Sequence, residues 1–162
     1  MPTSALQSYG TQTPGIPTPD IHTADAIGGL RVMILSAGGA VAAIDASRVR
    51  EVALRALAVR LPGAPSIVSG VVNVRGTLVP LVDLGLLLAS APAGATGWLV
   101  TLDLGGRRCA LALDSLPVLR TAGAPDGAAR AGHVCLASEV GVAGATLPLL
   151  DADALADDLL LH

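Results

Sequence analysis

The sequence predicts an all-β protein built from two copies of one small unit. Hydrophobic residues make up 52% of the chain and aromatic residues only 1%, so the core must consist of Val, Leu, Ile and Ala. β-Branched residues favour strands. Short apolar runs alternate with glycine turns, and part of this pattern recurs about 68 residues later. Because closing a sheet removes its exposed edges, we expect two small β-barrels packed together.

The first residues differ from the rest of the chain. Residues 1–28 are rich in Thr, Pro, Ser and Gly and have no apolar periodicity. Such a composition cannot form a core, so we expect a disordered tail. Residues 29–162 are long enough for one folded domain.

Three β-hairpins are predicted from pairs of apolar runs joined by glycine-containing turns. Glycine adopts the positive φ angles that two-residue hairpin turns need. The paired runs and their turns are 31–35 and 40–44 around Gly38-Gly39, 70–74 and 78–82 around Gly76, and 98–104 and 107–113 around Gly105-Gly106.

Three landmarks recur at nearly the same offset and indicate an internal duplication. The two Gly-Gly pairs are 67 residues apart, and Asp45 and Asp114, which follow the second strands, are 69 apart. The segment GTLVPLVDL at 76–84 returns as GATLPLLDA at 144–152, an offset of 68. A fixed period of this kind is typical of repeated structural units.

Two further segments carry helical signals. Residues 47–61 have apolar residues at helical spacing, with Ser47 as a candidate N-cap. The same segment also fits a short turn followed by a strand with outward-pointing arginines, and both interpretations stay open. Residues 152–161 predict a short helix with Leu155 and Leu159 on one face.

Composition and motifs exclude several classes of function. The net charge is −3, with no basic block and no aromatic platform, so we expect no nucleic-acid binding. The longest uncharged run, 84–102, is broken by Pro and Gly, and no signal segment precedes it, so we expect a cytoplasmic protein without membrane insertion. No phosphate-binding loop or nucleophile elbow occurs, which predicts a protein that is not an enzyme.

The candidate metal ligands fit structural roles better. Cys109 and Cys135 are expected to be reduced and buried. His133 would share a strand face with Cys135, but a metal site needs further ligands. Four C-terminal aspartates lack the spacing of a calcium loop, and a helix N-terminus explains the first two. We expect no metal and no cofactor. An interaction surface is the better expectation, because so apolar a chain must leave some apolar area exposed.

One charged pair interrupts the apolar run from Leu61 to Leu88. Arg75 and Asp83 are its only charged residues. Because burying an unpaired guanidinium costs several kcal/mol, Arg75 either pairs inside the fold with Asp83 or stands at the surface for a partner. The repeat favours the surface, since Asp83 has a counterpart at Asp151 whereas Arg75 corresponds to Ala143.

The same run resembles the signature of CheW-like domains, the adaptor modules of bacterial chemosensory arrays. The resemblance covers roughly residues 30–155. It rests on LPGAP (61–65), Gly70, N-x-R-G (73–76), P-x-x-D-L (80–84), Val49-x-Glu51-Val52 upstream and ALALDSL (110–116) downstream. It implies two five-stranded β-barrel subdomains, intertwined in one domain with short helices.

The resemblance also implies a non-enzymatic coupling function. CheW-like proteins bridge the cytoplasmic tips of methyl-accepting chemoreceptors and the regulatory domain of a CheA-type histidine kinase, in arrays at the membrane. Arg75 matches the arginine associated with receptor coupling, and Asn73 and Gly76 shape its turn. The other partner-binding residues that we carry over are Val49, Glu51 and Gly70.

Two departures from the family pattern leave an alternative function open. Gly85-Leu86-Leu87-Leu88 stands where the family often carries basic residues, and the N-terminal tail is long. The alternative is a CheW-like paralogue that acts as a scaffold or localisation factor in a pilus-linked or auxiliary array, without direct kinase control.

Overall fold

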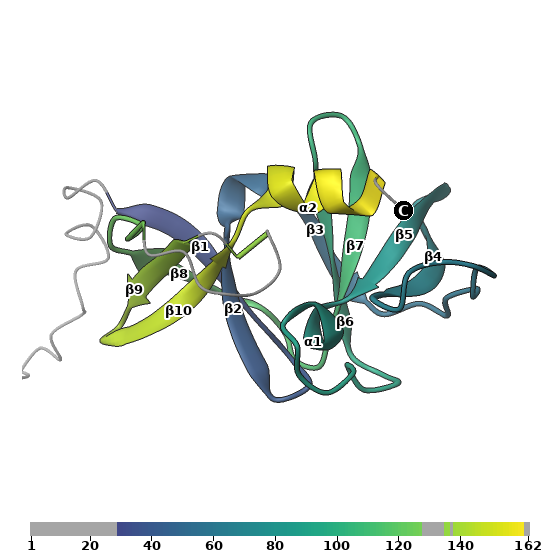
Figure 1. Ribbon diagram of the computed structural model, residues 1–162, viewed down its shortest axis with the longest axis horizontal. Coiled ribbons are helices and arrows are strands. Elements are labelled where there is room, and N and C mark those ends of the chain that lie inside the picture. The colour runs from purple at the N-terminus through teal and green to yellow at the C-terminus, as the bar shows by residue number, and fades with distance from the viewer. Residues whose placement is uncertain (1–28, 128–134, 137, 161–162) are drawn as a thin grey trace, which may run out of the picture.

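The protein is a two-sheet β structure with short helices (Figure 1). The computed structural model describes residues 29–127, 135–136 and 138–160, so the expected N-terminal tail and His133 lie outside the described residues. In chain order the elements are β1 (Leu30–Ala37), β2 (Ala40–Asp45), the 3-10 turn η1 (Ala46–Arg48), β3 (Val49–Leu54), β4 (Val68–Val74), β5 (Thr77–Asp83), α1 (Leu84–Leu87), β6 (Trp98–Asp103), β7 (Arg108–Leu113), β8 (Val118–Ala122), β9 (Ser138–Val142), β10 (Ala145–Leu150) and α2 (Ala152–Leu160).

The two halves of the chain exchange a hairpin. The first sheet has the order β8-β1-β2-β10-β9, and the second has the order β3-β6-β7-β5-β4. Each sheet therefore combines the opening hairpin of one half with the last three strands of the other half. The strands of the two halves correspond in chain order, so that β1 to β5 match β6 to β10. When each strand in the first sheet is replaced by its match, the order of the second sheet results, as expected for a duplication. The prediction of a mostly-β fold with two five-stranded sheets is confirmed.

Matching contacts join the edges of the two sheets. In the second sheet, Val59 follows β3 and pairs with Val71 of β4 through two backbone hydrogen bonds of 2.8 Å. In the first sheet, Asp126 follows β8 and pairs with Glu139 of β9. The two bridges are related by the same offset of about 68 residues as the sequence repeat. Among the described residues, isolated backbone contacts rather than continuous strand pairing thus join the edges of each sheet.

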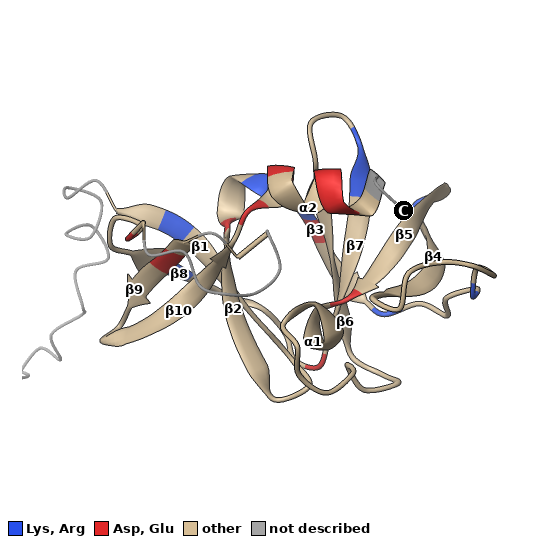
Figure 2. Cartoon of the chain, in the orientation of Figure 1, with Lys and Arg blue, Asp and Glu red and all other residues tan. Residues whose placement is uncertain are grey.

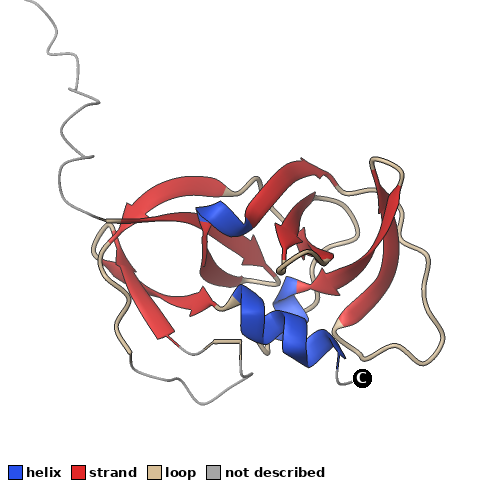
Figure 3. Cartoon of the chain, turned by 90° about the horizontal axis from the view of Figure 1, so that it is seen from above, coloured by secondary structure: helices blue, strands red, loops and turns tan. Residues whose placement is uncertain are grey.

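One hydrophobic core spans both sheets and both helices. Its fully buried residues include Leu35 and Ile44 of the first sheet, Leu111 of the second, Leu84 of α1 and Leu155 of α2. Seen from above, the helices lie between the two sheets (Figure 3). The predicted C-terminal helix is confirmed, and Leu155 and Leu159, which were predicted to share one face of it, both pack in this core.

Residues 47–61 could form either a helix or a turn followed by a strand, and the structure shows the turn and strand. Residues 46–48 form η1 and residues 49–54 form β3, while Arg50 is exposed. Ser47 is not the N-cap that the helical interpretation assigned to it. The Asp45 carboxylate accepts a hydrogen bond of 2.8 Å from the Ser47 N–H and caps the turn instead. Short strand segments with mixed periodicity are ambiguous because neighbouring strands decide their conformation.

Both cysteines are free and buried in the shared core. Burial raises the pKa of the Cys109 thiol to about 12 and that of the Cys135 thiol to about 11. Cys135 lies in a turn and not in the strand that its spacing from His133 suggested. No helix in the described part of the chain has the length and apolar character needed to cross a membrane.

The tip of the first hairpin forms a close joint with the segment after α1 and with Asp114 after β7. The Gly38 N–H donates to the Asp114 carboxylate at 2.7 Å, and the Ser90 hydroxyl donates to the Gly38 carbonyl at 2.7 Å. A Cβ atom on Gly38 would lie 1.7 Å from the Ala91 carbonyl oxygen. Only glycine fits at this position, so the joint depends on it.

We expect Gly38→Ala to lower the free energy of unfolding more than Gly39→Ala does, by about 1–3 kcal/mol, in chemical denaturation. Both glycines have positive φ, at 59° and 81°, so both substitutions strain the backbone. Only a Cβ on Gly38 collides with a neighbour, since nothing lies within 4 Å of one on Gly39. Equal losses would contradict the close joint.

A second expectation concerns alkaline stability. Above the ordinary thiol pKa of 9.0, the unfolded chain loses thiol protons that the native protein keeps up to about pH 11. The free energy of unfolding must therefore fall as the pH rises through this range, by at most about 1.4 kcal/mol per pH unit for each thiol. The sequence contains no lysine, so few other groups titrate there. Replacing both cysteines by alanine should flatten this slope in urea unfolding, and an unchanged slope would contradict the burial.

Candidate partner-binding site

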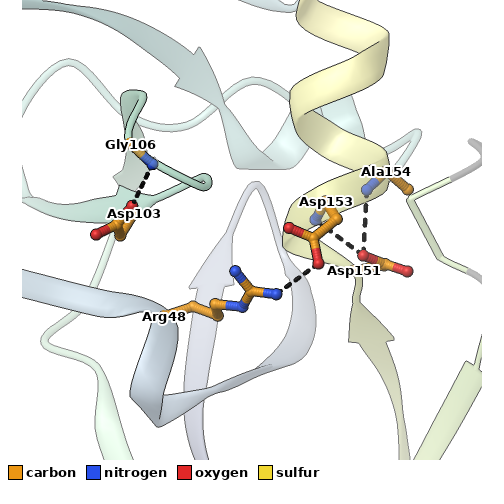
Figure 4. A network of polar contacts seen from close by, with 6 residues as sticks. All are labelled: Arg48, Asp103, Gly106, Asp151, Asp153 and Ala154. Atoms are coloured by element: carbon orange, nitrogen blue, oxygen red, sulfur yellow. Dashed lines mark hydrogen bonds and ion pairs between the residues drawn. The ribbon is translucent and has the colours of Figure 1, made fainter.

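The charged residues at the start of β3 each bind a different element. Arg48 forms an ion pair of 2.5 Å with Asp153 of α2 (Figure 4). The Arg50 Nε donates to Asp103 of β6 at 2.9 Å. Glu51 binds Arg75 at the tip of the β4–β5 hairpin. Residues 48–51 therefore tie three separate parts of the chain to one strand, and most of the chain consists of residues that are neither acidic nor basic (Figure 2).

Asp103 is held as a carboxylate by its neighbours. The Gly106 N–H donates to it at 3.1 Å within the β6–β7 turn, as Figure 4 shows. That hydrogen bond, together with Arg50, holds the pKa of Asp103 below its ordinary value. The Arg50–Asp103 ion pair holds the start of β3 against β6, next to Glu51.

Of the three arginines in these ion pairs, Arg75 has the most exposed side chain. The Arg75 Nε lies 2.5 Å from the Glu51 Oε2, with 81% of the Arg75 side chain and 23% of the Glu51 side chain exposed. The two residues are 24 positions apart in sequence. In the described part of the chain, Nε makes the only hydrogen bond of the guanidinium, so its other N–H donors face solvent.

The turn that carries Arg75 is duplicated, but the arginine is not. Arg75 and Gly76 have φ values of 48° and 82°, and Ala143 and Gly144 have 49° and 84°. Positive φ at both central residues is the pattern of a type I′ hairpin turn, which favours Asn or Gly at the first of them. The Asn73 side chain accepts a hydrogen bond of 2.8 Å from the Gly76 N–H and supports the turn, as predicted. Nothing in the turn geometry calls for arginine at this position.

Asp83 does not pair with Arg75. It is the N-cap of α1, with its Oδ1 accepting from the Leu86 N–H at 3.1 Å and from the Ala93 N–H at 3.0 Å. Asp151 caps α2 in the same way, through the N–H groups of Asp153 and Ala154. The duplicated aspartate is therefore a helix cap, and Arg75 stands at the surface.

Gly70 and Val49 lie near the pair but in different settings. Gly70 is buried, and a Cβ atom there would lie 2.3 Å from the Val59 carbonyl oxygen, so this glycine lets the segment after β3 approach β4. Val49 is half-buried and lines an open groove of about 460 Å³. The groove runs between the first sheet and the start of β3, and its other lining residues are Arg31, Met33, Asp45, Ala46, Ser47 and Leu119. The structure thus places Glu51, Asn73, Arg75 and Gly76 together, with Gly70 supporting the fold and Val49 facing the groove.

Exposed apolar side chains beside the site were not located from the sequence. Leu78, on the same hairpin as Arg75, is 69% exposed. Leu54 at the end of β3 is also exposed, as are three residues that follow it: Leu57, Val59 and Leu61. Leu57, Val59 and Leu61 alternate with a period of two, which places them on one face of an extended segment. This pattern in the sequence could have identified them as a set.

Comparison with known proteins assigns the chain to a family. The family model described as CheW-like domain matches residues 31–159. The chain belongs to the CheW-like domain family. Among solved structures, it is similar to the scaffolding protein TtCheW from Thermoanaerobacter tengcongensis, with a TM-score of 0.65 at 15% sequence identity, over 76% of this chain and 89% of that one. No curated protein sequence matches the chain.

We expect the Arg75–Glu51 pair to contribute little to stability. An exposed ion pair is worth about 0.2–1 kcal/mol, and asparagine relieves the left-handed strain at the first position of the turn. Arg75→Asn should therefore change the free energy of unfolding by less than about 1 kcal/mol. Ala143→Asn, the matched control in the duplicated turn, should be stabilising because it relieves the strain without losing an ion pair. Urea denaturation measures both, and a loss above about 2 kcal/mol for Arg75→Asn would make Arg75 a structural residue.

Proposed function

We propose that this CheW-like protein is a non-enzymatic adaptor that bridges the cytoplasmic tips of chemoreceptors and the regulatory domain of a CheA-type histidine kinase. The observation that carries the proposal is the exposed Arg75 guanidinium, fixed at one end by Glu51 on a turn that does not need an arginine. Family membership supports the adaptor function in general. Bridging receptors and kinase in a chemosensory array would place the protein in the cytoplasm, at the inner face of the membrane.

Arg75 is suited to bind a partner because its position is set before binding. The rigid two-residue turn and the Nε–Glu51 contact limit the rotamers that the side chain can adopt. Its free donors could then form hydrogen bonds to partner carboxylates or carbonyls with less ordering of the side chain. Leu78 adds exposed apolar area on the same hairpin, and buried apolar anchors next to an arginine are common where binding energy concentrates.

The exchanged topology supports binding at two places. The hairpin with Arg75 belongs to the second sheet, whereas the groove lined by Val49 also takes residues from β1 and β8 of the first sheet. Strands of both halves run through each sheet, so the two surfaces sit on one framework. We infer that this framework lets one protein hold two partners in a fixed relative orientation.

The departure at residues 85–88 does not favour the alternative function. Leu84, Gly85 and Leu87 are buried, and a Cβ atom on Gly85 would lie 2.0 Å from the Ala91 carbonyl oxygen. These residues pack α1 into the core, so their apolar character follows from this fold. A scaffold without kinase control remains the second candidate and is distinguished by its failure to change kinase activity.

The receptor-binding claim is tested with Arg75→Ala in a pull-down or calorimetric titration against a receptor tip from the same organism. We expect binding to weaken by about 30-fold or more, which corresponds to roughly 2 kcal/mol, while kinase binding is retained. Arg107→Ala is the matched control, because Arg107 is another exposed arginine that makes no ion pair with a described residue and lies outside both proposed binding sites.

The charge-reversed double variant Glu51→Arg/Arg75→Glu separates two explanations. If Arg75 itself contacts the receptor, restoring an ion pair with opposite polarity should not restore binding. If the pair only holds the hairpin in place, binding should recover. Unchanged receptor binding by Arg75→Ala would contradict the assignment of Arg75.

A further inference from the structure

A second cleft lies apart from the Arg75–Glu51 pair. It has a volume of about 360 Å³ and is bounded by the segment at 60–66, β4 and the start of α1. Leu61, Pro65, Val68, Leu86 and Pro92 provide apolar walls, and Arg60, Ser66, Ser69 and Asp83 provide the polar groups. This volume falls within the range of sites that hold small ligands or single side chains.

The cleft contains a buried carboxylate that is not fully bonded. Asp83 is only 5% exposed. Its Oδ1 accepts from Leu86 and Ala93, whereas its Oδ2 shares the Ala93 N–H at 3.1 Å and meets no other donor among the described residues. An ionised carboxylate can accept about four hydrogen bonds. Asp83, which lines the cleft, therefore has acceptor capacity left.

No cation of the described chain neutralises this carboxylate. Asp83 forms no ion pair with a described residue, and the guanidinium of Arg60, which also lines the cleft, is exposed and forms no hydrogen bond or ion pair with a described residue. A buried charge without a counter-ion is costly, and a cation that reaches it gains a strong interaction in the low dielectric. The cleft thus favours a cationic group at Asp83, with room for an anionic group beside Arg60.

The duplicated aspartate shows that capping does not require this arrangement. Asp151 caps α2 just as Asp83 caps α1, but Asp151 is exposed and its charge is solvated. Of the two capping carboxylates, only that of Asp83 is buried at the wall of a cleft lined by described residues. Capping of α1 therefore explains why an aspartate is present at position 83. Capping does not explain why a cleft lies beside this aspartate.

We propose that this cleft binds a lysine or arginine side chain of a partner protein. The cationic head would meet Asp83, the aliphatic stem would pack on Leu61, Val68 and Leu86, and an acidic group next to the basic residue would meet Arg60. Long basic side chains bind in this way because the stem is apolar and the head is charged. The proposal is independent of the Arg75 site.

The probe is N-acetylarginine, which carries a guanidinium and a carboxylate, titrated into the full chain and followed by amide NMR. We expect the Leu86 and Ala93 signals to shift, because both N–H groups donate to Asp83. N-acetylcitrulline, which keeps the carboxylate but has a neutral urea group in place of the guanidinium, should bind about tenfold more weakly. No shift of these two amides with the arginine probe, or an equal response to citrulline, would overturn the proposal.

Two variants form a matched pair for the same titration. Asp83→Asn and Asp151→Asn each remove one negative charge and keep a side chain that can cap a helix. We expect only Asp83→Asn to weaken binding of the arginine probe by about tenfold. Arg60→Ala should weaken the binding of N-acetylarginine. It should leave unchanged the binding of N-acetylarginine amide, which lacks the carboxylate. Equal effects of the two aspartate variants would also overturn the proposal.

Discussion

The exchange of hairpins between the two halves is the constraint on which the structure depends. β2 lies parallel to β10, and β7 lies parallel to β5, so the centre of each sheet joins strands from different halves. Neither half can complete a sheet alone, and the core spans both sheets as a consequence. The parallel pairing also places the aspartate after β5, and its counterpart after β10, at the same end of each sheet. There each one begins a helix that lies between the sheets.

Because the framework is duplicated, a feature that is present in only one half is not required by the fold. Such features are therefore candidates for function. The turn at Arg75 and the turn at Ala143 have the same backbone conformation, yet only one presents a charge. Likewise, Asp83 and Asp151 make the same cap, yet only Asp83 is buried beside a cleft. In each case the shared part follows from the fold, and we propose a bound partner as the reason for the unshared part. Both differences lie on the β4–β5 hairpin of the second sheet, with Arg75 at its tip and Asp83 at the end of β5.

Local patterns in the sequence were sufficient for much of the fold. Glycine pairs at Gly38-Gly39 and Gly105-Gly106 fixed two hairpins, and the repeat of G-x-x-x-P-L-x-D indicated the duplication. The partner of Arg75 was not predictable in this way, because Glu51 is 24 residues away and reaches it only when the edges of the second sheet meet. Residues 47–61 were ambiguous because pairing with β6 makes 49–54 a strand. The cleft at Asp83 likewise forms only when the segment at 60–66 folds over β4.

The central claim is that Arg75 couples this framework to a receptor while the kinase is held elsewhere on it. A reconstituted assay tests it most directly: autophosphorylation of the CheA-type kinase is measured with receptor membranes and with the wild-type chain or Arg75→Ala. The account predicts that wild-type protein makes kinase activity depend on the receptor, and that Arg75→Ala still binds the kinase but no longer confers this dependence. Receptor control of equal size with both proteins would contradict it, and so would kinase binding by the wild-type chain without any receptor-dependent change.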